Sequence, residues 1–217
     1  MKTAVLMTLP QSDDVTEYLH AFSQDIIKTS KDRGIPINLL ERERATKNNF
    51  ESELRPNHRL IVFNGHGSQD LITGHKEEVI IKKGENDKLL KEKITYARSC
   101  YSAKGIGNSS MKDSKTGCFI GYSFPFMFYN DITWSGNPSR DPVAKIFFTT
   151  TNKIPSGILK GKTCLEAHES SKKAMLKAIN KAVLNIDNPD AQPIAEALWN
   201  NYSFQTIIGN QNAKFND

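Results

Sequence analysis

Two short segments of the sequence hold the side chains best suited to covalent chemistry. Gly65-His66-Gly67 follows one apolar run, and Ser99-Cys100 follows another. An imidazole beside a thiol favours the thiolate, the form that attacks carbonyl carbon. When the two runs are neighbouring strands, His66 and Cys100 meet at the strand ends. The pattern therefore predicts a histidine and cysteine pair that performs acyl transfer at an amide bond.

The glycines beside His66 have a predicted role of their own. Glycine tolerates positive φ and lets backbone amides come close to a ligand. We therefore expect a tight turn that projects the His66 ring into a cleft. The same turn offers the amide of Gly67, together with the amide of Cys100, to the oxyanion that develops on an attacked carbonyl.

These segments need a scaffold that brings strand ends together, and the hydrophobic pattern indicates one. Short apolar runs alternate with longer amphipathic stretches, which is typical of an α/β domain. The runs are apolar at every position, as in a parallel sheet covered by helices on both faces. Active sites of such sheets lie beyond the carboxyl ends of the strands. We therefore predict a three-layer α-β-α sandwich with a mostly parallel sheet of about six strands, forming a single domain over 1–217.

The predicted elements follow one another along the whole chain. Strands are expected at 4–7, 35–40, 60–63, 94–97, 118–122 and 205–208, with a ribbon at 79–81. The first helix has Ser12, Asp13 and Asp14 as cap candidates and a stripe of Val15, Leu19, Phe22 and Ile26. Further helices are expected at 46–54, 85–91, 141–185 with a break at 155–161, and 194–201. The helix after the break should have Leu165, Met175, Ile179, Ala182 and Val183 on one stripe.

The two motifs together resemble those of a known family, the caspase and gingipain fold of cysteine peptidases. That family includes metacaspases and the bacterial caspase-like CHAT domains of multidomain defence proteins. The resemblance rests on an apolar strand before Gly65-His66-Gly67-Ser68, a second before Ser99-Cys100, and a closing strand and turn at Ile207-Ile208-Gly209-Asn210. It implies a cysteine endopeptidase acting on a protein substrate. His66 is then the general base or acid and Cys100 the nucleophile, with the Gly67 and Cys100 amides as the oxyanion hole.

Two charged residues bear on the predicted substrate. Arg98 stands two residues before the nucleophile, where the resemblance implies a wall of the first specificity pocket and where metacaspases, which cut after arginine or lysine, have aspartate. By charge complementarity, Arg98 favours an acidic or polar side chain on the acyl side of the cut bond. Asp131 lies in the aromatic-rich stretch 123–134, where the resemblance implies a substrate-binding loop, and there it would select a basic side chain. These alternatives stay open, as does a solvated strand-end position for Arg98.

Composition excludes several other classes of protein. The 217 residues include 29 Lys and Arg against 24 Asp and Glu, a mild net charge of +5, and mean hydropathy is −0.50. No apolar run approaches the roughly 18 residues of a membrane span, and the start MKTAVLMTLPQSDD lacks the pattern of a signal peptide. We therefore expect a cytoplasmic protein without a membrane partner. The lysines of 172–181 are expected on a solvated helix face, so we expect no nucleic-acid partner.

The cysteines and glycines also limit the choice of cofactor. Cys100, Cys118 and Cys164 are three cysteines at wide spacings, which argues against a disulfide framework and a Cys-x-x-Cys metal site. Cys118 and Cys164 are expected in the core. The glycine segments complete neither a phosphate loop nor a dinucleotide fingerprint. The acidic cluster linked to calcium in metacaspases is missing after the histidine loop. We therefore expect no cofactor and no metal.

A second function stays open on the same residues. The pair can belong to an interaction module of the same fold, closed off until a regulatory protein partner or a cut rearranges its loops. The two hypotheses predict different thiols. A working pair should depress the pKa of Cys100, whereas a dormant module should leave Cys100 no more reactive than Cys118.

Overall fold

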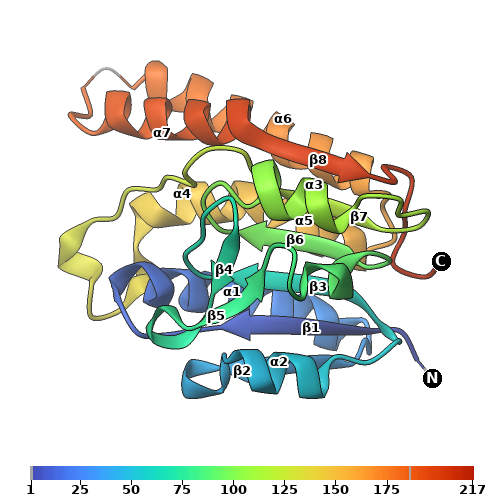
Figure 1. Ribbon diagram of the computed structural model, residues 1–217. Coiled ribbons are helices and arrows are strands. Elements are labelled where there is room, and N and C mark those ends of the chain that lie inside the picture. The colour runs from blue at the N-terminus through green and yellow to red at the C-terminus, as the bar shows by residue number, and fades with distance from the viewer. Residues whose placement is uncertain (1, 186) are drawn as a thin grey trace.

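The computed structural model describes residues 2–185 and 187–217 and centres on a six-stranded sheet (Figure 1). The strands stand in the order β2, β1, β3, β6, β7, β8. Their bounds in that order are Ile37–Glu41, Ala4–Leu9, His58–Asn64, Ile94–Arg98, Cys118–Tyr122 and Gln205–Gly209. All neighbouring strands are parallel except the last pair, in which β8 runs antiparallel to β7. The mostly parallel α/β sheet predicted from the sequence is confirmed.

One face of the sheet is covered by a layer of long helices (Figure 1). The layer contains α1 (Asp14–Asp32), α4 (Pro142–Thr151), α5 (Lys153–Leu159) and α6 (Cys164–Val183), with α7 (Ala191–Phe204) packed against α6. Ile26 of α1 and Ile158 of α5 share one apolar cluster with Leu60 of β3 and Tyr96 of β6. Because side chains alternate across a strand, the residues of β3 and β6 next to Leu60 and Tyr96 point to the opposite face.

That opposite face carries a thinner layer. It consists of α2 (Lys47–Glu53), the hairpin of β4 (Leu71–Thr73) with β5 (Val79–Lys82), and the short helix α3 (Asn108–Ser110). Phe50 of α2 and Ile80 of β5 belong to one cluster with Ile61 and Phe63 of β3. Both faces of the central strands are therefore buried, which explains why their sequences are apolar at every position. The result is the predicted three-layer sandwich.

The helical predictions are wrong in three details. Only Asp87–Leu90 of the stretch 85–91 is helical, and it forms a 3-10 turn. The break expected at 155–161 falls at 160–163, because Pro155 lies in the first turn of α5, where its missing N–H leaves no bond unmade. Val15 and Val183 are exposed. The buried face of α6 consists instead of Cys164, Ala167, His168, Ser171 and Met175.

Two further expectations from composition are met in the described part of the chain. None of its helices has the length and apolar character needed to cross a membrane. Cys118 and Cys164 are both buried in the core. Hydrogen bonding to Cys164 and burial together raise the pKa of the Cys118 thiol, so Cys118 stays protonated and unreactive.

Candidate active site

The two predicted motifs meet at the carboxyl edge of the sheet, where β3 and β6 are neighbours. Asn64 at the end of β3 lies opposite Arg98 at the end of β6. Just beyond them, the hydroxyl of Ser99 donates to the carbonyl of Gly65 at 3.0 Å. His66 and Cys100 each stand one residue beyond this cross-link, so the structure brings the two loops that carry them together.

The glycines beside His66 are required for space, and not for positive φ as the sequence suggested. Neither has a φ in the left-handed region. A β-carbon on Gly67 would lie 2.9 Å from Cβ of Ser99 and 3.3 Å from the carbonyl oxygen of Cys100. A β-carbon on Gly65 would lie 2.3 Å from the carbonyl oxygen of Thr73. The histidine loop therefore lies directly on the backbone of the nucleophile turn.

Backbone bonds hold the histidine loop on both sides. The N–H of Thr73 donates to the carbonyl of His66 at 3.0 Å, which ties the loop to β4. The N–H of Ile106 donates to the carbonyl of Gln69 at 2.9 Å, which ties it to the π-helical turn Ala103–Gly107 after the nucleophile. The position of His66 relative to Cys100 is therefore set by several bonds and not by one side chain.

The nucleophile stands on a strained turn between β6 and this π-helical turn. Tyr101, directly after Cys100, has φ of 57°, a conformation that costs a bulky L-residue about 1–2 kcal/mol. Its ring packs edge-on against Phe124 with 5.5 Å between the centroids. Backbone strain of this kind persists where the surrounding structure imposes it, and strained residues cluster at functional sites. The turn leaves Cys100 partly exposed.

The Cys100 thiol is protonated at neutral pH in this structure. Burial raises the pKa of Cys100 above its ordinary value, and the backbone N–H groups of Phe126 and of Cys100 itself lower it only in part. Within the described ranges, no hydrogen bond joins His66 to Cys100. The depressed pKa expected of a working pair is therefore not found, because burial raises the pKa of the thiol and no hydrogen bond from His66 offsets that effect.

His66 is engaged with Asp13, a residue to which the sequence assigned only a helix cap. Nε2 of His66 lies 3.0 Å from Oδ2 of Asp13. Both side chains are about one-third exposed, at 36% and 37%. A contact across 53 residues leaves no trace in the spacing of the chain, so only the order of strands in the sheet could have revealed it.

The predicted oxyanion donors are available. Across residues 2–185 and 187–217, the backbone N–H groups of Gly67 and Cys100 make no bond to a protein oxygen. A hollow of about 340 Å³ opens beside them, lined by Ser68, Gln69, Asp70 and Tyr101. Neither amide is thus used by a protein oxygen, although the Cys100 N–H contacts its own sulfur, and a hollow adjoins the two loops that carry them.

Arg98 is buried, which excludes the solvated strand-end position. Its side chain is 1% exposed, and burial lowers the pKa of its guanidinium. One nitrogen donates to the Ser23 hydroxyl at 3.2 Å, while Nε and Nη1 have no acceptor among the described residues. The guanidinium lies 5.7 Å from the ring centre of Tyr96 and 5.5 Å from that of Phe148.

Aromatic rings from the stretch after β7 pack over the neighbours of Arg98. Phe126 lies 5.0 Å from the ring of Tyr122 and 6.1 Å from that of Phe148. Phe128 lies 5.0 Å from Phe148 as well. The same Phe126 places its backbone N–H on the sulfur of Cys100. The stretch after β7, predicted to bind substrate, therefore covers the aromatic neighbours of Arg98 and contacts Cys100.

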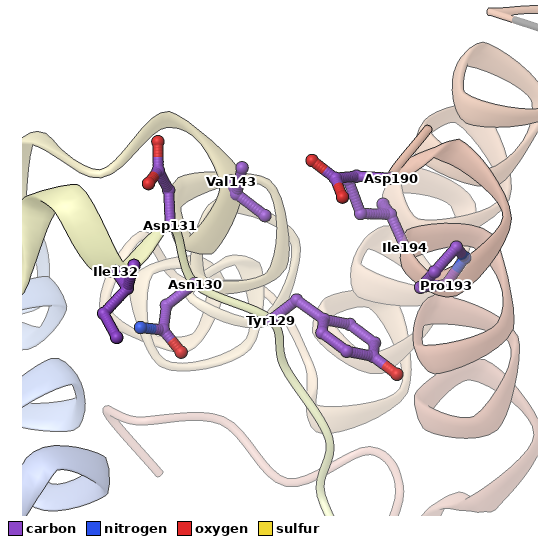
Figure 2. Close-up of a pocket in the computed structure, with 8 residues that line it drawn as sticks. All are labelled: Tyr129, Asn130, Asp131, Ile132, Val143, Asp190, Pro193 and Ile194. Atoms are coloured by element: carbon purple, nitrogen blue, oxygen red, sulfur yellow. The ribbon is translucent and has the colours of Figure 1, made fainter. Parts of the chain in front are cut away.

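Asp131, the alternative pocket residue, lies in a different cavity (Figure 2). This cavity of about 320 Å³ is lined by Asp131, by Asp190 before α7, and by six further residues that include neither His66, Arg98 nor Cys100. Asp131 caps a short turn by accepting from Thr133. In the described ranges no cluster of three or more histidine, cysteine or acidic side chains could hold a metal.

Comparison with known proteins adds no family: no family profile matches the chain, and no curated protein is significantly similar to it.

Proposed function

We propose that the chain is a cytoplasmic cysteine endopeptidase of the caspase and gingipain type that uses His66 and Cys100 to hydrolyse peptide bonds. One observation carries the proposal: Gly67 lies against Ser99 and Cys100 with no room for a β-carbon. A glycine loop that carries a histidine is thereby fixed on the turn that carries a cysteine. The amides of Gly67 and Cys100, neither of which bonds to a protein oxygen among the described residues, support the same assignment.

The proposed reaction begins from a neutral thiol. As the Cys100 sulfur bonds to the peptide carbonyl carbon, the S–H bond breaks and His66 takes the proton. The Gly67 and Cys100 amides hold the oxyanion. His66 then gives the proton to the amine as the C–N bond breaks. A water molecule, deprotonated by His66, attacks the acyl carbon. The C–S bond then breaks, the acid leaves, and His66 returns the proton to the Cys100 sulfur. The raised pKa of Cys100 favours proton transfer during attack over ionisation beforehand.

We further propose an acidic residue on the acyl side of the cut bond. A buried guanidinium with two nitrogens that have no acceptor among the described residues is suited to bind a carboxylate. Native proteins pair almost all such groups, so the unpaired state indicates that the partner comes from outside. Arg98 is two residues from the nucleophile, whereas Asp131 lines a cavity without catalytic residues. Arg98 is therefore the favoured pocket residue.

The second candidate function, a latent module opened by a regulatory protein, is favoured by a different observation. His66 binds Asp13 and not Cys100, and aromatic rings seal the surroundings of Arg98. A protein in this state admits no acidic side chain until the stretch 123–131 moves. On this hypothesis the structure is the resting form, and a partner shifts the loop.

The deciding experiment is cleavage of a peptide library varied at the residue before the cut. We expect wild type to cut after Asp or Glu, Cys100→Ala to cut nothing, and Arg98→Gln to lose the acidic preference. Cleavage after Lys or Arg would contradict the role of Arg98 and support Asp131. Cleavage that survives Cys100→Ala would contradict the peptidase assignment.

Phe126→Ala separates the two candidates. In a latent protein, removing this ring should open the pocket and start cleavage after acidic residues, together with faster modification of Arg98 by phenylglyoxal. Phe50→Ala removes a ring from the opposite face of the sheet and controls for general loosening. When wild type, Phe126→Ala and the control are equally inactive, neither candidate is supported unless an added partner opens the site.

A further inference from the structure

The carboxylate of Asp13 makes two bonds at once, one to its own helix and one to His66. Asp13 is the N-cap of α1, and its Oδ1 accepts the N–H of Thr16 at 2.8 Å. The Thr16 hydroxyl oxygen accepts the N–H of Asp13 at 3.1 Å in return. The other carboxylate oxygen, Oδ2, lies 3.0 Å from Nε2 of His66. The helix cap thus fixes the carboxylate, and its second oxygen is directed at the histidine.

The order of strands in the sheet explains how this contact arises. Asp13 follows β1, His66 follows β3 and Cys100 follows β6, and these three strands are successive neighbours. Neighbouring strands lie about 4.8 Å apart. The three loops therefore leave the sheet side by side along one edge, and that of His66 is the middle one. The loop that carries Asp13 is therefore on one side of the histidine loop, and the loop that carries Cys100 is on the other.

The contact decides which ring nitrogen carries the proton. Burial raises the pKa of Asp13, but hydrogen bonds from Thr16 and His66 lower it further, so that it lies below its ordinary value. The carboxylate is therefore ionised at neutral pH and can only accept hydrogen bonds. Nε2 must be the N–H donor, and in the neutral imidazole the lone pair is then on Nδ1.

We propose that Asp13 is a positioning residue that fixes the Nε2–H tautomer of His66 and makes Nδ1 the nitrogen that exchanges protons with Cys100. The inference rests on the proposed peptidase function. As the bond from sulfur to carbon forms, the S–H bond breaks and Nδ1 takes that proton. The carboxylate faces the imidazolium that results. The Nδ1–H bond then breaks as the proton passes to the leaving amine.

Asp13→Asn tests this role without removing the helix cap. Asparagine is as good an N-cap as aspartate, and its Oδ1 keeps the bond from Thr16. Its amide then presents N–H groups to Nε2, which requires the opposite tautomer. ¹⁵N NMR of the His66 ring, assigned with His66→Gln, should show Nε2–H in wild type and Nδ1–H in Asp13→Asn. Asp14→Asn removes the same charge one residue along and should keep the wild-type tautomer.

Kinetics supply the second readout. We expect Asp13→Asn to lower kcat by about 100-fold or more, with KM and the unfolding midpoint close to wild type. An Nδ1–H tautomer in wild type, or an unchanged tautomer in Asp13→Asn, would overturn the inference. Because the tautomer is read without substrate, a protein that switches tautomer but cuts no peptide contradicts the proposed function alone.

Discussion

Two buried arginines, Arg59 and Arg98, differ in how completely their guanidinium groups are hydrogen-bonded. Arg59 donates to the carbonyls of Lys214, Glu92 and Thr116. Arg98 has one bond, to Ser23, and two idle nitrogens. Burying a charged group without full pairing is destabilising. Arg98 is therefore retained at a cost in stability, which is the pattern expected of a residue that serves a ligand.

Arg98→Met is expected to stabilise the fold while abolishing cleavage after acidic residues. Methionine can occupy the space between Tyr96 and Phe148 with no charge to desolvate. Replacing buried ionic groups by apolar ones often raises the free energy of unfolding by about 1–4 kcal/mol. Urea unfolding measures the gain. Arg59→Met is the matched control and should destabilise, because it orphans three carbonyls. A less stable Arg98→Met would show that the guanidinium supports the fold.

Single residues were predictable from the sequence to the extent that their neighbours in the chain define them. His66 and Cys100 could be singled out because each follows an apolar strand, His66 between two glycines and Cys100 directly after Ser99. Asp13 was visible only as a helix cap, since its contact with His66 depends on which strands are adjacent. The burial of Arg98 likewise depends on Ser23 of α1, on Phe148 of α4 and on rings of the stretch after β7, which no local pattern joins.

Among the elements, the histidine loop shows most clearly how packing sets a site. It is held between β4 and the π-helical turn Ala103–Gly107. The sequence predicted strands β1, β3 and β7 closely because they are buried on both faces. It did not predict β4, because a strand of three residues is too short to show a hydrophobic periodicity. It misplaced the break before α6, because a proline inside the first turn of a helix looks like a terminator.

Gly67→Ala is expected to push the histidine loop away from the nucleophile. The new β-carbon would lie 2.9 Å from Cβ of Ser99, and overpacking of this kind costs about 1–3 kcal/mol. Thermal unfolding should show the loss, and cleavage should fall further than stability alone explains. Gly136→Ala is the control, because a β-carbon there meets open space and should change stability by less than about 0.5 kcal/mol. Equal thermal stability and equal cleavage by the two variants would contradict the close contact between the histidine loop and Ser99.

On the scale of the whole molecule, Glu92 binds Thr116 at the edge of the sheet opposite the site. Its carboxylate accepts from the hydroxyl and N–H of Thr116, at 2.6 Å and 2.9 Å. These bonds, that from the hydroxyl first, lower the pKa of Glu92 to about 2. A carboxylate with a depressed pKa stabilises the fold above its unfolded-state pKa and loses that effect as pH falls through the folded-state value.

The contribution of Glu92 should therefore disappear in acid. Urea midpoints of wild type and Glu92→Gln are expected to differ at pH 6 and to converge as the pH falls from about 4.3 toward 2. Glu169→Gln, an exposed change on α6, should have the same urea midpoint as wild type at either pH. A difference that persists unchanged at pH 2 would mean that Glu92 acts through packing and not through its charge.

The distribution of the site along the chain has a consequence for how this molecule can change. Asp13, His66 and Cys100 all lie within the first hundred residues, whereas the rings that enclose Arg98 come largely from the connection between β7 and α4 and from α4 itself. The proposed catalytic groups and the segment that covers the surroundings of Arg98 thus lie in separate stretches of the chain. On the proposed function, insertions or substitutions in 123–141 can change which substrates are bound, while Asp13, His66 and Cys100 at the strand ends stay unchanged.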